Sequence, residues 1–283
     1  MTTVSLEKLL AFVEADAPFG DVTSEAVLDG GDCTARLRFR ETGIAAGLAE
    51  AEALFAHYGA AVKRRADDGD RIAAGAIALV LEGPVGGVLL VERTALNLVG
   101  RMSGIATATA RYAALARESD PRARVAATRK TAPGLGLLDK KAVLLGGGDP
   151  QRYTLSDGVL IKDNHLALVS IEEAVRRARA HTAYKTVEVE VETVDEAVRA
   201  ARAGADIVML DNMTPGGAKE AIGALTAAGL RDRVRVEVSG GVTEATIGAY
   251  AAAGADLISV GALTHSVRSL DLTLEVSRPR QAD

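Results

Sequence analysis

The chain has 283 residues, of which 48% are hydrophobic and 25% are charged, and its formal net charge is −5. These values are typical of a soluble globular protein with one large or two modest domains. Basic residues are scattered among acidic ones, so we expect no nucleic acid partner. No apolar run approaches the roughly 18 residues of a membrane span, so we expect no membrane partner. The single cysteine, Cys33, fits a reducing compartment, and we predict a cytoplasmic protein.

The first part of the chain begins with helical patterns. Residues 6–15 carry apolar side chains at helical spacing, and a second helix is expected over residues 46–58. Between them, Thr23 or Ser24 is placed to cap a short helix.

Strand patterns follow in the same part. Alternation over residues 33–40 predicts a half-exposed strand, and the glycine-punctuated stretch 62–87 predicts hairpins. We therefore expect residues 1–105 to form an N-terminal α+β sandwich domain built on an antiparallel sheet. The tail, residues 266–283, is expected to pack on this domain.

The pattern changes after the first hundred residues. Helices are predicted over 87–98 and 102–117, and strand-like and helix-like runs then alternate. Strands are expected to end near residues 129, 162, 191, 211, 238 and 260, with helices over 170–181, 193–203, 215–228 and 243–253. This alternation is typical of successive βα units. We predict an α/β fold in which residues 106–265 form an incomplete parallel α/β barrel with the active site.

Charged residues stand where these predicted strands end. Arg129 and Lys130 follow the first strand, Lys162 ends the second, Glu190 lies in the third and Asp211 ends the fourth. A single charge of this kind is usually solvated. Gathered at one barrel mouth, however, the charges need each other or a charged ligand, because burying an unpaired charge costs several kcal/mol. Barrel enzymes carry their active sites at this end of the strands.

Glycine loops close the last two strands. Ser239, Gly240 and Gly241 precede a helix expected from about Thr243, and Gly261 with Ala262 follows the final strand. Backbone N–H groups at such turns bind phosphate, and the last two loops of a barrel are the usual phosphate site. The alternative is that the glycines serve only tight turns.

Two further residues are candidates for the site. Arg152 ends a polar loop after the glycines at 146–148, and its guanidinium suits a carboxylate, unless the segment is an ordinary mobile loop. His165 is placed to orient its neighbours, with a structural role as the alternative. The histidines and Cys33 show no zinc-site spacing, and there is no nucleophile elbow or Walker-type loop.

Several phrases, in order along nearly the whole chain, carry a resemblance to a known family. They are Ala17–Thr23, Glu92–Asn97, Ser103–Thr107, Thr128–Leu135, Leu160–His165, Leu210–Asn212 and Ser259–His265. In these phrases the chain resembles the quinolinate phosphoribosyltransferase family. The resemblance implies an α/β N-terminal domain, an incomplete α/β barrel and a homodimer.

The resemblance also implies an activity. Members of the family transfer a phosphoribosyl group from phosphoribosyl pyrophosphate to quinolinate with Mg²⁺ as cofactor. They release pyrophosphate and CO₂ and form nicotinate mononucleotide, a precursor of NAD. The chain is thus expected to be a glycosyltransferase of the pentosyltransferase type.

Site roles carry over by resemblance onto the matching positions. Arg129, Arg152 and Lys162 would hold the quinolinate carboxylates, with Arg93 contributed across the subunit interface. Thr128 and Lys130 would line the same mouth. Glu190 and Asp211 would hold the ribose hydroxyls or Mg²⁺. The 5′-phosphate would be bound by Ser239, Gly240, Gly241, Val260, Gly261 and Ala262, and the catalytic residues would be Lys130, Lys162, Glu190 and Asp211.

One position departs from the family phrase. Gln151 stands where the family usually has a histidine, and glutamine cannot become cationic. A charge-assisted hydrogen bond contributes about 1.5–3 kcal/mol against roughly 1 for a neutral one, so acid binding would weaken on the order of tenfold. The change could also mark another acid, as in a related subgroup associated with molybdate transport. The intact phrase Lys162–His165 favours quinolinate.

Three alternatives therefore stand beside transfer to quinolinate. The first is phosphoribosyl transfer to a different aromatic acid. The second is a barrel lyase that uses Lys162 or Lys130 as a Schiff base. The third is a non-catalytic relative that only binds ligand.

Overall fold

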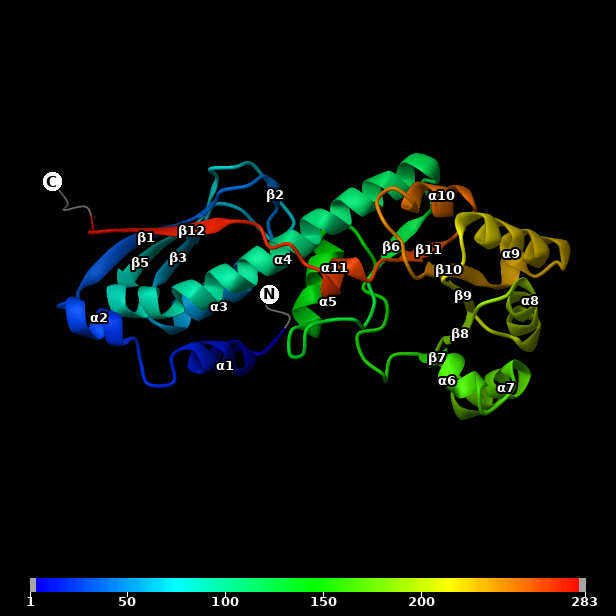
Figure 1. Cartoon of the computed structure of the whole chain (residues 1–283). Helices are drawn as coiled ribbons and strands as arrows, with labels where there is room; N and C mark the ends of the chain where they lie inside the picture. The colour runs from blue at the N-terminus through cyan, green and yellow to red at the C-terminus, as the bar shows by residue number, and fades with distance from the viewer. Residues whose placement is uncertain (1–3, 280–283) are drawn as a thin grey trace. The chain divides into compact units, whose positions relative to one another are not determined.

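The computed structural model describes residues 4–279 (Figure 1). The chain folds as two compact units. Unit 1 comprises Met1–Ala108, Pro133–Gly147 and Val267–Asp283, and unit 2 comprises Thr109–Ala132 and Gly148–Ser266. Among the described residues, no helix combines the length and the hydropathy that a membrane span requires.

Unit 1 is built on a four-stranded antiparallel sheet in the order β12-β1-β5-β3. Its strands are β1 (Asp32–Phe39), β3 (Ala61–Arg64), β5 (Ile77–Pro84) and β12 (Leu272–Ser277), with a separate pair β2 (Gly43–Ile44) and β4 (Arg71–Ile72). Burial alternates along β1 as the sequence predicts, because successive side chains point to opposite faces. The strand β12 pairs with β1, so the described part of the tail belongs to this sheet.

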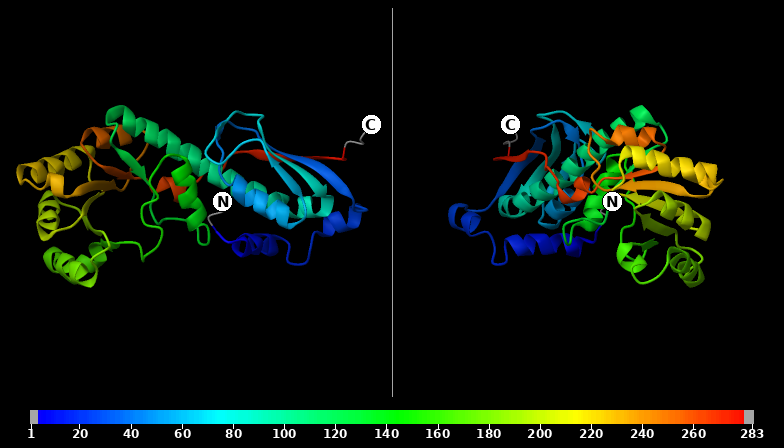
Figure 2. Two further views of the ribbon diagram at one scale, coloured as in Figure 1. Left: turned by 180° about the vertical axis from the view of Figure 1, so that it is seen from behind. Right: turned by 45° about the vertical axis from the view of Figure 1, so that its right-hand side comes forward.

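The helix α3 (Leu48–His57) and the first part of α4 (Val85–Ser119) lie on one face of that sheet (Figures 1 and 2). The helix α1 (Leu6–Asp16) packs against α3. The other helices of unit 1 are α2 (Val22–Val27) and α5 (Gly136–Leu145). The predicted cap of α2 is wrong: Asp21 is the N-cap, and its carboxylate accepts from the backbone N–H groups of Thr23 and Ser24. The helix begins one residue before Thr23, which makes both predicted caps donors in its first turn.

Where two helices were expected, α4 is one helix of 35 residues. Glycines within it do not break it. A Cβ at Gly104 would overlap the carbonyl oxygen of Arg268 and lie 3.1 Å from the Cα of Ser269. Gly104 therefore lets the tail approach the helix backbone, and a close approach rather than a turn explains this glycine.

The helix α5 belongs to unit 1, although the sequence reading assigned all of residues 106–265 to the barrel. Charge pairs account for the difference. The guanidinium of Arg101 donates two hydrogen bonds, of 2.8 and 2.9 Å, to the buried carboxylate of Asp139. Lys141 pairs with the buried Glu50 at 2.7 Å and with Asp68 at 2.9 Å. Buried acids are tolerated when they are paired in this way.

Unit 2 is built on six parallel strands in the order β6-β11-β10-β9-β8-β7. The strands are β6 (Arg124–Ala126), β7 (Val159–Ile161), β8 (Val187–Val191), β9 (Ile207–Asp211), β10 (Arg235–Ser239) and β11 (Leu257–Ser259). Helices α7 (Ile171–His181), α8 (Val194–Ala203), α9 (Pro215–Ala227) and α10 (Ile247–Ala252) lie outside them (Figure 2). Shorter helical pieces are α6 (Asp163–Leu166), η1 (Arg231–Arg233) and α11 (Ala262–His265).

Two predicted boundaries in unit 2 are wrong. The strand β6 ends at Ala126, three residues before the expected position. The helix α10 begins at Ile247 rather than near Thr243. The N–H of Thr243 donates to the Oγ1 of Thr246 at 3.0 Å, and the N–H of Thr246 donates to the Thr243 carbonyl at 3.1 Å. A turn therefore occupies the residues expected to open the helix.

The six strands curl into an incomplete barrel, as predicted. Glu188, Ile207, Arg235 and Leu257 stand on four strands in linked register and share one face. Residues from all six strands line one cavity of about 400 Å³. A flat sheet could not bring six strands around one cavity. The two edge strands, β6 and β7, leave a gap on one side, which is called the seam below.

Candidate active site

The predicted rim residues of unit 2 lie at the carboxyl ends of the parallel strands. They are Thr128, Arg129 and Lys130 after β6, Lys162 after β7, Glu190 on β8, Asp211 at the end of β9, Ser239, Gly240 and Gly241 at β10, and Val260, Gly261 and Ala262 after β11. All six strands contribute, so the structure brings the set to one end of the barrel.

Lys162 and Glu190 form an ion pair across neighbouring strands. Ile161 pairs with Val189, so the next residues of β7 and β8 fall side by side and face the interior. The backbone N–H of Lys162 donates to Nδ1 of His165 at 3.0 Å. This contact caps the short helix α6, so His165 orients the backbone of Lys162.

Three cations gather near the seam. The guanidinium of Arg152 donates to the carbonyl of Gly158 at 3.2 Å, and its buried Nε has no hydrogen-bond partner among the described residues. Burial, and less strongly the charge of Arg129, lowers the pKa of Arg152, while Glu188 opposes the shift. Glu188 also feels the charge of Lys162. Arg129, Arg152 and Lys162 thus act on one region with donors available for an anion.

Glu190 and Asp211 are the two carboxylates of the rim, on the neighbouring strands β8 and β9. Glu190 pairs in register with Met209, so Glu190 and Asp211 share the interior face. Asp211 accepts a hydrogen bond of 2.6 Å from the amide of Asn212. No cluster of three His, Cys, Asp or Glu residues suited to a metal occurs among residues 4–279. Two carboxylates still fit Mg²⁺, which binds few protein ligands and completes its shell with water and substrate phosphates.

The glycine loops show why glycine is needed. Gly240 has φ +93, and a Cβ there would overlap the side-chain oxygen of Asn212 and lie 2.9 Å from its backbone nitrogen. Gly241 follows with φ +62. A Cβ at Gly261 would lie 3.1 Å from the ring of His265 and 3.5 Å from Cδ of Lys130. The second loop and Lys130 therefore lie together, as a phosphate site requires.

Lys130 is fixed through its backbone. Its N–H donates to Oγ1 of Thr128 at 3.1 Å, and its carbonyl accepts from the hydroxyl of Thr264 at 2.9 Å. The charged end of the side chain stays exposed. Thr128 therefore holds the loop that presents Lys130.

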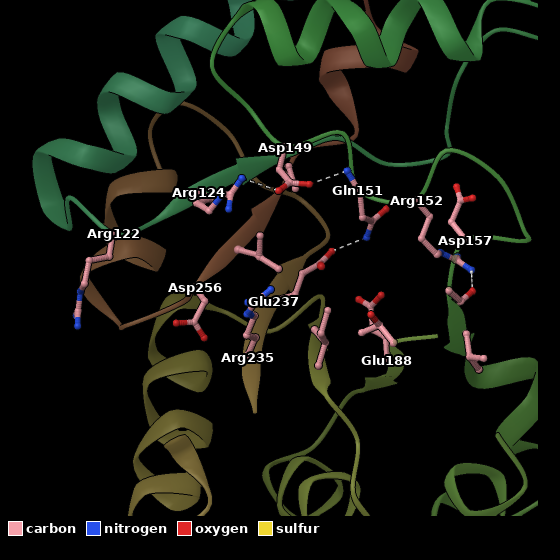
Figure 3. Close-up of a pocket in the computed structure, with 16 residues that line it drawn as sticks. Arg122, Arg124, Asp149, Gln151, Arg152, Asp157, Glu188, Arg235, Glu237 and Asp256 are labelled. Atoms are coloured by element: carbon pink, nitrogen blue, oxygen red, sulfur yellow. Dashed lines mark hydrogen bonds and ion pairs between the residues drawn. The ribbon is translucent and has the colours of Figure 1, made fainter. Parts of the chain in front are cut away.

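Two acids in the barrel interior were not among the predicted site residues. Glu188 and Glu237 are 4% and 1% exposed and line the cavity (Figure 3). Burial and the neighbouring Glu237 raise the pKa of Glu188 to about 9. The sequence does contain a signal for these acids. Glu188 stands two residues before Glu190, and Glu237 stands two residues before Ser239. A strand returns to the same face every two residues, so each acid shares a face with a predicted site residue.

The structure also gives the positions of two further predicted residues, Gln151 and Arg93. The amide nitrogen of Gln151 donates to Glu237 at 2.8 Å, so this side chain points into the barrel interior (Figure 3). Arg93 is exposed on the part of α4 that belongs to unit 1. Its role at the site stays a prediction.

Comparisons with known proteins bear on this arrangement. Residues 21–103 match the family described as "Quinolinate phosphoribosyl transferase, N-terminal domain", and residues 105–275 match its C-terminal domain. The chain is 48% identical over 267 residues to the probable nicotinate-nucleotide pyrophosphorylase [carboxylating] of Methanothermobacter thermautotrophicus, covering 93% of this chain and 96% of that one. The counterpart of the same name from Archaeoglobus fulgidus is 43% identical, covering 92% and 99% of the two chains.

A solved structure shows the same likeness. NadC from Streptococcus pyogenes superposes with a TM-score of 0.88 at 37% identity, covering 96% of this chain and 97% of that chain. Matches to both domains, at this identity and coverage, show that the chain belongs to the quinolinate phosphoribosyltransferase family.

Proposed function

We propose that the chain transfers a phosphoribosyl group from phosphoribosyl pyrophosphate to quinolinate, with loss of CO₂, and so forms nicotinate mononucleotide for NAD biosynthesis. The observation that carries this proposal is the gathering of Arg129, Lys162, Glu190 and Asp211 at the carboxyl ends of the barrel strands, with Arg152 near enough to Arg129 to feel its charge. The names of the relatives, nicotinate-nucleotide pyrophosphorylase [carboxylating], support it.

The charges suit two anionic substrates. Quinolinate is a dianion and the other substrate is a polyphosphate, so their approach is opposed by repulsion. Fixed cations offset that repulsion and hold the pyridine nitrogen behind C1 of the ribose. The unpartnered Nε of Arg152 is a donor ready for a carboxylate. Lys162 must exchange its contact with Glu190 for one with substrate.

Glu190 and Asp211 suit the ribose. As pyrophosphate leaves, positive charge grows on the sugar ring, and nearby carboxylates stabilise it. The same two residues would hold Mg²⁺, which supplies neutralisation of the charge that develops on the departing pyrophosphate. Lys130, beside the Gly261 loop, would neutralise phosphate charge from the protein side.

Decarboxylation needs little from the protein. Once the ring nitrogen is alkylated, its positive charge stabilises the electron pair that stays on the adjacent ring carbon as CO₂ leaves, and that carbon then takes a proton from solvent water. The step therefore needs no protein acid or base and no covalent nucleophile. The rim offers cations, carboxylates and backbone N–H groups, which is the set that this chemistry uses.

A panel of acids tests the substrate. With phosphoribosyl pyrophosphate and Mg²⁺, we expect pyrophosphate release with quinolinate and little with nicotinate or other aromatic monoacids, because one carboxylate leaves part of the cation cluster unpaired. Turnover only with another acid would contradict the proposal. Borohydride trapping of a carbonyl compound on Lys130 or Lys162 would instead support a Schiff-base lyase.

We also propose a homodimer in which Arg93 of one subunit completes the site of the other. Its support is the family resemblance and the exposure of the Arg93 side chain. We also propose a cytoplasmic location. The single cysteine, which is buried and free, is consistent with it.

A further inference from the structure

The loop that carries Arg152 runs along the free edge of β6. The N–H of Asp149 donates to the carbonyl of Val125 at 2.8 Å, and the N–H of Ala127 donates to the carbonyl of Asp149 at 2.9 Å. One residue of the loop is therefore paired like a strand. The chain beyond Asp149 then turns into the seam between β6 and β7.

Gln151 makes that turn in an unusual conformation. Its φ is 54°, in the left-handed region that residues with a side chain rarely adopt. Such conformations persist when surrounding contacts fix them. Two contacts do so: the backbone N–H donates to the carboxylate of Asp149 at 2.9 Å, and the side-chain amide donates to Glu237 at 2.8 Å. The second contact joins the loop to the barrel interior (Figure 3).

Glu237 is a firm anchor for this contact. It is 1% exposed at the middle of β10. The oxygen that accepts from Gln151 also accepts from the hydroxyl of Ser259 on β11 at 2.5 Å. The hydroxyl of Ser259 on a second strand therefore holds the acceptor that receives Gln151.

Arg152, in contrast, has little to fix it. Among the described residues its guanidinium donates one hydrogen bond, to the carbonyl of Gly158 at 3.2 Å, and its Nε lacks a partner. No carboxylate lies within ion-pair distance of it in the described part of the chain. The position of its backbone, one residue after the anchored Gln151, therefore decides where the guanidinium reaches.

We propose that Glu237, supported by Ser259, is a positioning residue for the acid substrate: through Gln151 it fixes the loop that presents Arg152. The proposal rests on the proposed function, because Arg152 matters only if an acid binds there. It assigns Gln151 to the support of the site rather than to substrate contact. We do not propose that Glu237 itself contacts the substrate.

Variants at both ends of the contact test the proposal. Glu237→Met removes the acceptor at similar volume, and Gln151→Ala removes the donor at a less buried position. Each should raise the KM for quinolinate about tenfold, the effect of one lost hydrogen bond, and leave the KM for phosphoribosyl pyrophosphate unchanged. Glu237→Gln keeps an oxygen that accepts from Gln151 and Ser259, so its KM should stay within about threefold of the unchanged protein.

A double variant and a control separate positioning from general damage. If Glu237 acts through Gln151, the double variant should be no worse than either single one, because both break the same contact. Val236→Ala is the control: it is a neighbouring buried residue on the other face of β10. It should lower Tm without raising the KM for quinolinate. Additive effects, or a Glu237→Met that behaves like Val236→Ala, would overturn the proposal.

Hydrogen exchange over residues 148–158 separates this proposal from the proposed function. Glu237→Met should speed exchange in that segment, and Val236→Ala should not. If the unchanged protein fails to turn over quinolinate while exchange responds as expected, the proposed function fails and the anchoring stands. If quinolinate is turned over but neither KM nor exchange responds to Glu237→Met, the anchoring is overturned and the function stands.

Discussion

Glu188 and Glu237 are both buried inside the barrel of unit 2, where two ionised carboxylates would repel each other. Burial and this repulsion favour a proton on Glu188, whereas Gln151 and Ser259 both donate hydrogen bonds to Glu237. These acids were hidden because the phrase from Val187 to Val191 alternates like a half-exposed strand. In a barrel the second face is an interior that can hold polar groups.

The buried pair makes the stability of unit 2 depend on pH. The pKa of Glu188 is raised to about 9, from an ordinary value of 4.5, chiefly by burial and then by Glu237. The folded protein thus keeps a proton that the unfolded chain releases between these values. The stabilisation is complete below 4.5 and is lost as pH rises towards about 9, by at most about 1.4 kcal/mol per pH unit.

Glu188→Gln is the comparison for that effect, since its amide has a shape similar to that of the protonated acid and does not titrate. Thermal unfolding measured from about pH 5.5 to about pH 8.5 should show a larger fall in Tm for the unchanged protein than for the variant. Parallel Tm profiles would show that the pair does not hold its proton in this range.

Alanine substitutions at Gly240 and Gly241 should lower the stability of the fold by different amounts. Both have positive φ, so alanine at either costs about 1–2 kcal/mol. At Gly240 the added Cβ also overlaps Asn212, whereas at Gly241 it meets no described atom within 4 Å. Gly240→Ala should therefore lower stability about twice as much as Gly241→Ala, in denaturant or thermal unfolding. Equal losses would mean that the Asn212 contact gives way at little cost.

At the scale of elements, the parallel strands were easiest to place from sequence. Runs such as Asp206–Asn212 are apolar for a few residues and then stop on charge, and β9 ends at Asp211 as expected. Predicted element boundaries were wrong where a local contact, which the hydrophobic pattern does not reveal, set the end of a helix or strand. Thr246 closes a turn that delays α10, and α4 continues as one helix through residues 99–101, which lie between the two predicted helical ranges.

Two glycine substitutions in α4 test the close approach of the tail to this helix. Gly104→Ala places a Cβ against the backbone of Arg268 and Ser269, and we expect a loss of about 1–3 kcal/mol as the tail is pushed away. Gly86→Ala, in the first turn of the same helix, meets no described atom within 4 Å and should be neutral or stabilising by about 0.5–1 kcal/mol. Unfolding curves of the two variants check this, and similar curves would refute the close approach.

In the whole molecule, the predicted rim residues all belong to unit 2, and Arg93 belongs to unit 1. The rim on unit 2 was predictable, because parallel strands bring their carboxyl ends to one edge and sequence order fixes which residues stand there. The assignment of α5 to unit 1 was not, since it depends on ion pairs such as Arg101 with Asp139, between residues far apart in sequence. The anchor at Glu237 was likewise invisible, because it needs the three-dimensional path of the loop before Arg152.

The proposed dimer makes a prediction that requires two kinds of subunit. Arg93→Ala and Lys162→Ala should each abolish activity, because each removes one cation of the site. Mixed and allowed to exchange, they should recover up to about a quarter of the activity, since one site in a mixed dimer keeps both cations and half of the dimers are mixed. The recovery is measured as pyrophosphate release. Exchange without recovery would contradict a shared site.

The proposed function requires that phosphoribosyl transfer and decarboxylation occur at one site in unit 2. The direct measurement is simultaneous release of pyrophosphate and CO₂ from phosphoribosyl pyrophosphate, Mg²⁺ and carboxyl-labelled quinolinate. We expect the two products in equal amounts, both lost together in Lys162→Ala. Pyrophosphate without CO₂, or no release of either from the unchanged protein, would contradict the claim.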